Sequence, residues 1–120
     1  MTIREASERY GLPMRLLRAY ESWRPQENAR EQVRYDESDR RRLSVMMTLQ
    51  ASGFGEREIE RYMKLLLAGE ATRTERLQML ERKRSGTLEE IHCRERQIDR
   101  LDYLLFEIRR SMSEKKGFSG

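Results

Sequence analysis

Apolar residues recur every three or four positions along most of the chain, which predicts a mainly α-helical protein. Thr2, followed by Glu5 three residues later, has the pattern of an N-terminal capping box, and Gly11 is placed to end this first helix. Pro13 suits the first turn of a second helix, predicted over 13–21. A short helix, a glycine-containing turn and a second helix together make a helix-turn-helix.

The second predicted helix has two different sides. Leu16 and Leu17 are expected to face inward, whereas Arg15 and Arg18 share an outer face that Tyr20 extends on the next turn. Such a face suits the DNA major groove and its flanking phosphates. A solvated helix that happens to carry two arginines explains the same stretch, so this helix alone leaves both interpretations open.

Residues 23–35 interrupt the helical pattern, because Pro25 stops the helix and the following residues are polar without a clear period. We interpret the segment as a loop or a wing that ends in a short strand. Arg24, Arg30 and Arg34 could add a second contact to the DNA backbone, although a plain solvated loop fits the composition equally well.

Two more helices are predicted, one with Asp36 as N-cap running to Ala51 and one over 56–67, with a glycine-rich turn between them. A short linker is expected at 68–74. The inward-facing residues of these two helices are expected to be Leu43, Met46, Met47, Leu49, Ile59, Tyr62, Met63, Leu66 and Leu67.

From Glu75 onward the pattern is that of one long helix with a heptad seam, weak in its first half and strong from Ile91. A lone helix with such a stripe needs a partner. Folding back on the N-terminal domain is the alternative, but the stripe is longer than so small a domain can cover, which favours a homodimer. The predicted dimer interface comprises Leu77, Leu80, Ile91, Ile98, Leu101, Leu105 and Ile108.

The predicted domain organisation is therefore a DNA-binding domain at 1–70, a linker and coiled-coil dimerisation helix at 71–112, and a flexible, fraying tail at 113–120. Charged residues make up 38% of the 120-residue chain and hydrophobic ones 37%, and the net charge is +4. The first 70 residues hold 13 Lys and Arg against 12 Asp and Glu, so DNA binding has to come from where the charges lie.

The sequence gives little support for other classes of protein. It has no Ser/His/Asp set, no glycine-rich phosphate loop and no clustered ligands, so we expect neither an enzyme nor a cofactor. Cys93 and His92 are adjacent, about 100° apart on a helix, and cannot chelate a metal alone. Cys93 could instead sense an oxidant or electrophile, although an inert helix cysteine is the default.

No apolar run approaches the roughly 20 residues that span a bilayer, and the N-terminus has no signal-peptide pattern. A single cysteine suits a reducing compartment. We therefore expect a cytoplasmic protein without a membrane partner.

Several stretches in order resemble the MerR family of bacterial transcription regulators. Two stretches near the N-terminus resemble the family's opening helix and turn and its recognition helix: TIREASERYGL and LLRAYES. Two more resemble the start of the family's second helical pair and its Leu-Gly-Phe-Ser-x-x-Glu-Ile segment: YDESDRRRL and LQASGFGEREIERYMKL. The stretch LDYLLFEI resembles the end of the family's dimerisation helix. The resemblance implies a winged helix-turn-helix and a homodimer joined by an antiparallel coiled coil. It also implies binding to a pseudo-palindromic promoter site, whose spacer the dimer distorts so that RNA polymerase engages both elements. Such a protein is bacterial and nucleoid-associated when bound.

Carried over residue by residue, the resemblance makes Arg18 and Tyr20 DNA-backbone contacts and Tyr35 the final tyrosine of the wing. Arg15 shares their outward face. The Gly-Tyr-Arg signature of the family's wing is absent from this chain, and Arg34 could substitute for it. Ala19 replaces the first aromatic of the usual tyrosine pair. These departures keep an alternative open: a dimeric coiled-coil protein-interaction module with the same fold that has lost promoter binding.

Overall fold

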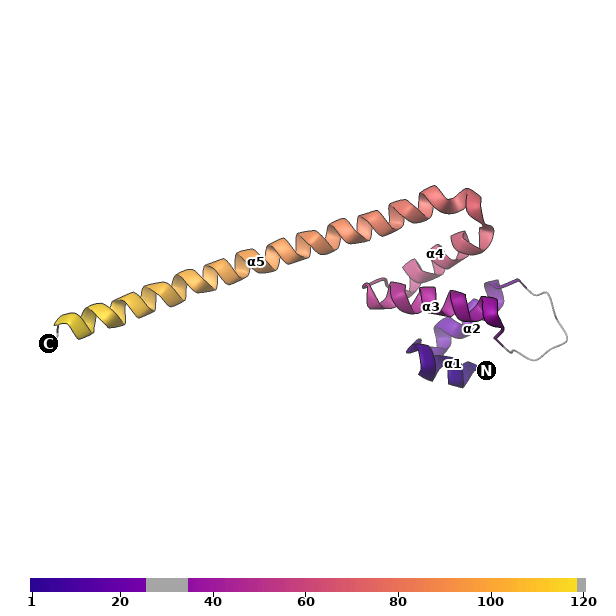
Figure 1. The fold of residues 1–120 in the computed structure, drawn as a ribbon, viewed down its shortest axis with the longest axis horizontal. Coiled ribbons are helices and arrows are strands. Elements are labelled where there is room, and N and C mark those ends of the chain that lie inside the picture. Colours follow the sequence, from indigo (N-terminus) through magenta and orange to yellow (C-terminus); the bar gives the residue numbers. More distant parts are fainter. Residues whose placement is uncertain (26–34, 119–120) are drawn as a thin grey trace. The chain divides into compact units, whose positions relative to one another are not determined.

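The computed structural model describes residues 1–25 and 35–118, with side chains as far as residue 114. The described residues contain no strand, so the protein is mainly α-helical, as predicted. The expected wing falls chiefly on residues 26–34, outside the described residues, and stays a prediction. The elements are α1 (Ile3–Tyr10), α2 (Met14–Trp23), α3 (Glu37–Ala51), α4 (Glu56–Ala68), the 3₁₀ turn η1 (Glu70–Thr72) and α5 (Arg73–Phe118) (Figure 1).

Local signals account for the first two helices. Thr2 Oγ1 accepts a hydrogen bond from the backbone N–H of Glu5 at 3.2 Å and so caps α1. Gly11 ends α1 in the left-handed conformation, with φ 64°, which glycine adopts without strain. The carbonyl of Pro13 accepts from the N–H of Leu17 at 3.2 Å, so Pro13 precedes α2 rather than forming its first residue.

The ends of α3 and α4 lie within one residue of their predicted positions. The carboxylate of Asp36 accepts from the N–H of Asp39 at 2.9 Å, and the carboxylate of Asp39 accepts from the N–H of Asp36 at 2.9 Å. This reciprocal capping box starts α3. At the start of α4, Glu58 Oε1 accepts from the N–H of Gly55 at 3.1 Å.

The predicted linker is shorter than expected because much of it is helical. Gly69, with φ 103°, separates α4 from η1, and Thr72 Oγ1 donates to the carbonyl of Leu65 at 2.6 Å. The long helix α5 begins at Arg73, two residues earlier than predicted. It continues through Gly86 and runs to Phe118, into the segment expected to fray.

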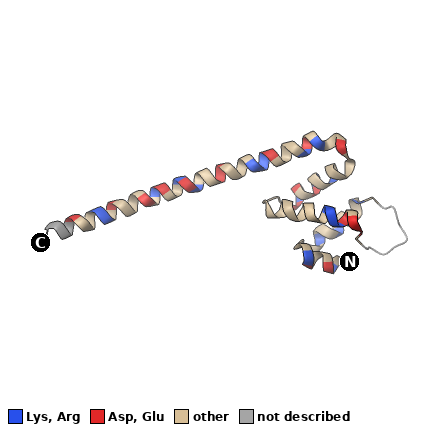
Figure 2. Ribbon diagram, viewed as in Figure 1, with Lys and Arg blue, Asp and Glu red and all other residues tan. Residues whose placement is uncertain are grey.

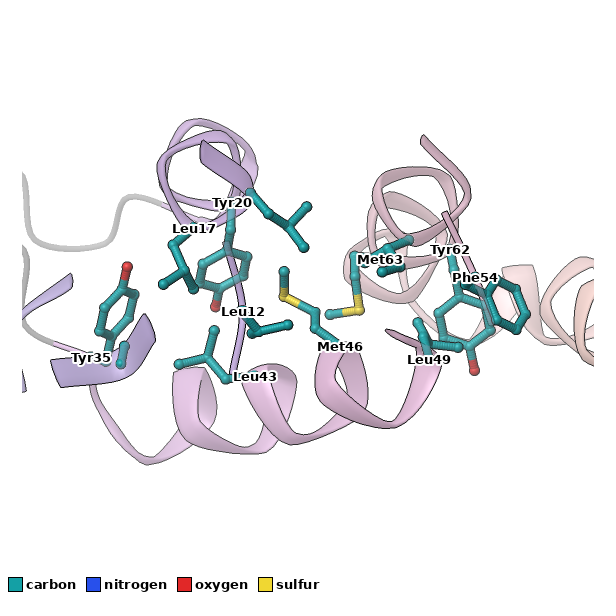
Figure 3. Packing of buried hydrophobic residues seen from close by; sticks show 13 residues of the cluster. Leu12, Leu17, Tyr20, Tyr35, Leu43, Met46, Leu49, Phe54, Tyr62 and Met63 are labelled. Carbon is teal, nitrogen blue, oxygen red and sulfur yellow. The ribbon is translucent and has the colours of Figure 1, made fainter. Parts of the chain in front are cut away.

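The chain divides into two compact units, Met1–Leu80 and Glu81–Gly120. In the first unit, α1 contacts α2 and α3, and α4 contacts α2 and α3. Met47 was expected inside but is exposed, because the inward side of α3 carries Leu43 and Met46 and the next position turns away. The core between these helices (Figure 3) consists of Ala6, Leu12, Leu16, Leu17, Tyr20, Tyr35, Leu43, Met46, Leu49, Phe54, Ile59, Tyr62 and Met63.

The second unit is the remaining length of α5, along which basic and acidic residues alternate closely (Figure 2). Its apolar side chains are not covered within the single chain. Seven residues of α5 were predicted to form a dimer interface, and each is between 39% and 60% exposed: Leu77 and Leu80 in the first unit, and Ile91, Ile98, Leu101, Leu105 and Ile108 in the second. Leu88, Tyr103, Leu104, Phe106 and Met112 are exposed as well.

Candidate nucleic-acid interface

The outer face of α2 carries the two arginines singled out from the sequence. Leu16 and Leu17 are buried against the core, and this orientation leaves Arg15 and Arg18 exposed on the opposite side. The two arginines are three residues apart and therefore neighbours on the helix surface. Arg18 forms no ion pair with any residue that the structure describes, so its guanidinium is available to a phosphate.

Arg15 differs from Arg18 because it is paired with Glu56, the first residue of α4. Arg15 Nε lies 2.9 Å from each carboxylate oxygen of Glu56, and Nη2 lies 2.6 Å from Oε1. The hydrogen bond from Arg15 holds the pKa of Glu56 below its ordinary value, and the same bond raises the pKa of Arg15. The pair thus stays charged on both sides, and sequence analysis did not find it because its members are far apart in the chain.

Tyr20 does not extend this outer face, and that part of the sequence prediction is wrong. Tyr20 is 0% exposed, because position 20 lies three and four residues after the buried Leu17 and Leu16 and so shares their face. Figure 3 shows the Tyr20 ring among the buried side chains of the core. Its hydroxyl donates a hydrogen bond to Asp39 Oδ1. Burial raises the pKa of Tyr20, so the phenol stays neutral. Tyr20 therefore contributes to the core and presents no group to DNA in this structure.

Tyr35 is also placed differently from the expectation. Its ring is buried, and its hydroxyl donates to Glu21 Oε1 at 2.8 Å. Burial, followed by this hydrogen bond, raises the pKa of Tyr35. The guanidinium carbon of Arg24 lies 5.4 Å from the centre of the ring, a cation–π contact. Arg30 and Arg34, the other basic residues proposed for the wing, lie outside the described residues.

A buried polar cluster joins the end of α2 to the start of α3, and Asp39 lies at its centre. Arg24 Nη1 lies 3.1 Å from Asp39 Oδ2, and Arg42 Nη1 lies 3.6 Å from Oδ1 and 3.3 Å from the hydroxyl of Tyr20. The side chain of Asp39 is 5% exposed and that of Arg24 16%. No buried polar side-chain atom within the described parts of the chain lacks a partner. The sequence could not reveal this cluster, since the tertiary partners of Asp39 leave no local pattern.

The described residues show no group of three or more His, Cys, Asp or Glu placed to hold a metal ion. Cys93 is a free, exposed thiol on α5, and its proposed sensor role stays a prediction. Within the same described ranges, no helix is both long enough and apolar enough to cross a membrane.

Comparison with known proteins gives one result. The sequence model for MerR HTH family regulatory proteins matches residues 1–66, which include α1, α2, α3 and most of α4. Neither the curated proteins nor the solved structures gave a match. The matched domain supports a DNA-binding transcriptional regulator, and regulators of this kind are typically not enzymes. Because this match covers more than half of its length, the chain belongs to the MerR HTH family of regulatory proteins.

Proposed function

We propose that this protein regulates transcription as a homodimer that binds a pseudo-palindromic site in promoter DNA. The observation that carries the proposal is the exposed arginine pair on α2, the second helix of a MerR-type helix-turn-helix. Arg18 would contact a phosphate, and Arg15 would enter or border the major groove. Basic residues on such a helix provide both the sequence-independent attraction and the register on the duplex.

The homodimer part of the proposal rests on α5. Its heptad stripe is exposed along the single chain, and burying such a stripe against a second copy would remove apolar surface from water. A two-fold dimer would present two copies of α2 and therefore call for two half-sites. By similarity with the family, distortion of the promoter spacer would be the means by which the bound dimer affects RNA polymerase.

The alternative is a dimeric interaction module of the same fold that no longer binds promoters. One observation favours it: Tyr20 and Tyr35, both expected to contact DNA, are buried and hydrogen-bonded within the domain. Both hypotheses predict a dimer, so DNA binding is the property that separates them.

The test is a salt titration of DNA binding by the wild-type protein and the Arg18→Ala variant, using duplexes selected from a random library and scrambled versions of them. Arg18→Ala should weaken binding to all duplexes about equally and lower the salt slope by about 1, as the loss of one phosphate contact does. Arg96→Ala, which removes the same charge from an exposed position on α5, should leave both quantities nearly unchanged.

Absence of wild-type binding even at low salt would overturn the proposal in favour of the interaction module. Equal affinity and equal slope for wild type and Arg18→Ala would remove Arg18 from the interface. Relaxed preference at a single base pair would instead assign Arg18 to a base edge.

A further inference from the structure

The contact between Arg15 and Glu56 joins α2 to α4 across 41 residues of sequence. The carboxylate engages one edge of the guanidinium, formed by Nε and Nη2. A guanidinium has five N–H groups, and this edge uses only the Nε–H and one N–H of Nη2. Both N–H groups of Nη1 and the second one of Nη2 remain, and the Arg15 side chain is 77% exposed.

We propose that Glu56 is a positioning residue that holds Arg15 so that its second edge reads a guanine in the major groove. The inference rests on the proposed function, because it requires that α2 enter DNA. Two parallel N–H donors match the O6 and N7 acceptors of guanine, and this pairing is the commonest specific arginine contact in the major groove. An arginine side chain that is already oriented loses less conformational freedom when it binds.

The charges favour a base over a phosphate as the target of Arg15. Glu56 balances the positive charge of Arg15, so the pair offers little net attraction to the DNA backbone. A carboxylate next to a phosphate-binding arginine would oppose the contact. Arg18, one helical turn away and without an ion pair to a described residue, lacks this opposition. Arg18 would therefore bind the DNA backbone, and Arg15 would contact a base edge and so recognise sequence.

The experiment compares the base preferences of full-length wild type and the Glu56→Gln variant, each selected from the same library of random duplexes. Glu60→Gln is the matched control: Glu60 lies on the same helix, is exposed to a similar degree and is paired with Lys64 at 3.0 Å. We expect the wild type to prefer guanine at one position of each half-site by roughly 5- to 150-fold. Glu56→Gln should lose most of this preference while binding scrambled duplexes at least as tightly, and Glu60→Gln should retain it.

Arg15→Lys provides an independent readout. It keeps the positive charge but removes the two-pronged donor geometry, so it should lose the same guanine preference with an unchanged salt slope. Circular dichroism of each variant would check that the helices are intact.

Three results would overturn the role of Glu56 or the proposed function. If Glu56→Gln binds every sequence more tightly and keeps the guanine preference, the carboxylate only repels phosphate and the inference is wrong. If Glu60→Gln loses the preference equally, the effect is one of general charge and the inference is again wrong. If the wild type binds no duplex at low salt, the proposed function itself fails.

Discussion

Asp39 is the residue on which most polar contacts of the core depend. It accepts from Tyr20, pairs with Arg24 and Arg42, and closes the capping box of α3. Charged groups taken out of water are tolerated only when they are paired and hydrogen-bonded. Asp39 therefore makes it possible to hold two arginines against the apolar core.

Removing the Asp39 carboxylate should destabilise the domain. Asp39→Ala would leave Arg24 and Arg42 without their shared partner, and we expect the free energy of unfolding to fall by about 3–5 kcal/mol. Urea denaturation followed by circular dichroism would measure the change. Glu60→Ala breaks an exposed pair with Lys64 and should lower the same quantity by no more than about 1 kcal/mol. Similar small losses for the two variants would show that the buried cluster is not what stabilises this domain.

At this scale the sequence predicted residue types better than residue partners. The outward direction of Arg15 and Arg18 followed from their spacing relative to Leu16 and Leu17. Tyr20 was predicted to extend the face of the arginines, but it follows Leu17 and Leu16 by three and four residues and therefore lies on the side of those leucines. The contact with Glu56 could not be found, because no local pattern links residues that only the fold brings together.

The helices themselves were predictable because their ends carry local signals. Thr2, Gly11 and Asp36 specify where helices begin and end through contacts with residues at most a few positions away. The errors lie where no such signal exists. Met47 was assigned to the core from its apolar character. The linker after α4 was expected to be longer, because the hydrogen bond from Thr72 to Leu65 of α4, which accompanies η1, leaves no local pattern.

Two glycines in different backbone conformations should respond to alanine with opposite signs. Gly11 has φ 64°, where a Cβ is strained, so Gly11→Ala should lower the free energy of unfolding by about 1 kcal/mol. Gly86 lies within α5, and an added Cβ would meet open space. Gly86→Ala should therefore raise the free energy of unfolding by about 0.5–1 kcal/mol. Thermal or urea unfolding would measure both. A stabilising effect at Gly11 would contradict the left-handed helix end, and a destabilising one at Gly86 would indicate that something covers that position.

For the whole molecule, the central question is what covers α5. The family match ends at residue 66, before this helix begins, so the dimer rests on the heptad pattern and on the exposed apolar residues. Interleaved charges on the remaining faces of α5 keep it compatible with water (Figure 2). The sequence could predict the stripe, but not how it pairs, because a second chain leaves no mark on the pattern of the first.

A charge placed in the stripe should separate the subunits. Leu101→Asp or Leu105→Asp would bury a carboxylate between apolar side chains, so we expect a monomer or an unfolded chain by sedimentation. Arg96→Asp changes the charge at a heptad position on the opposite side of α5 and should remain a dimer. An intact dimer for both leucine variants would exclude the assigned seam.

The contact between Arg24 and Tyr35 has a consequence for the segment that joins them. The guanidinium lies 5.4 Å from the centre of the tyrosine ring, and both residues are held independently, by Asp39 and Glu21. Arg24 and Tyr35 are therefore fixed next to each other by contacts to described residues, none of which involves residues 26–34. Insertions and deletions between these two residues should be tolerated far better than any within the helices, which makes this the place where the domain can be extended without being redesigned.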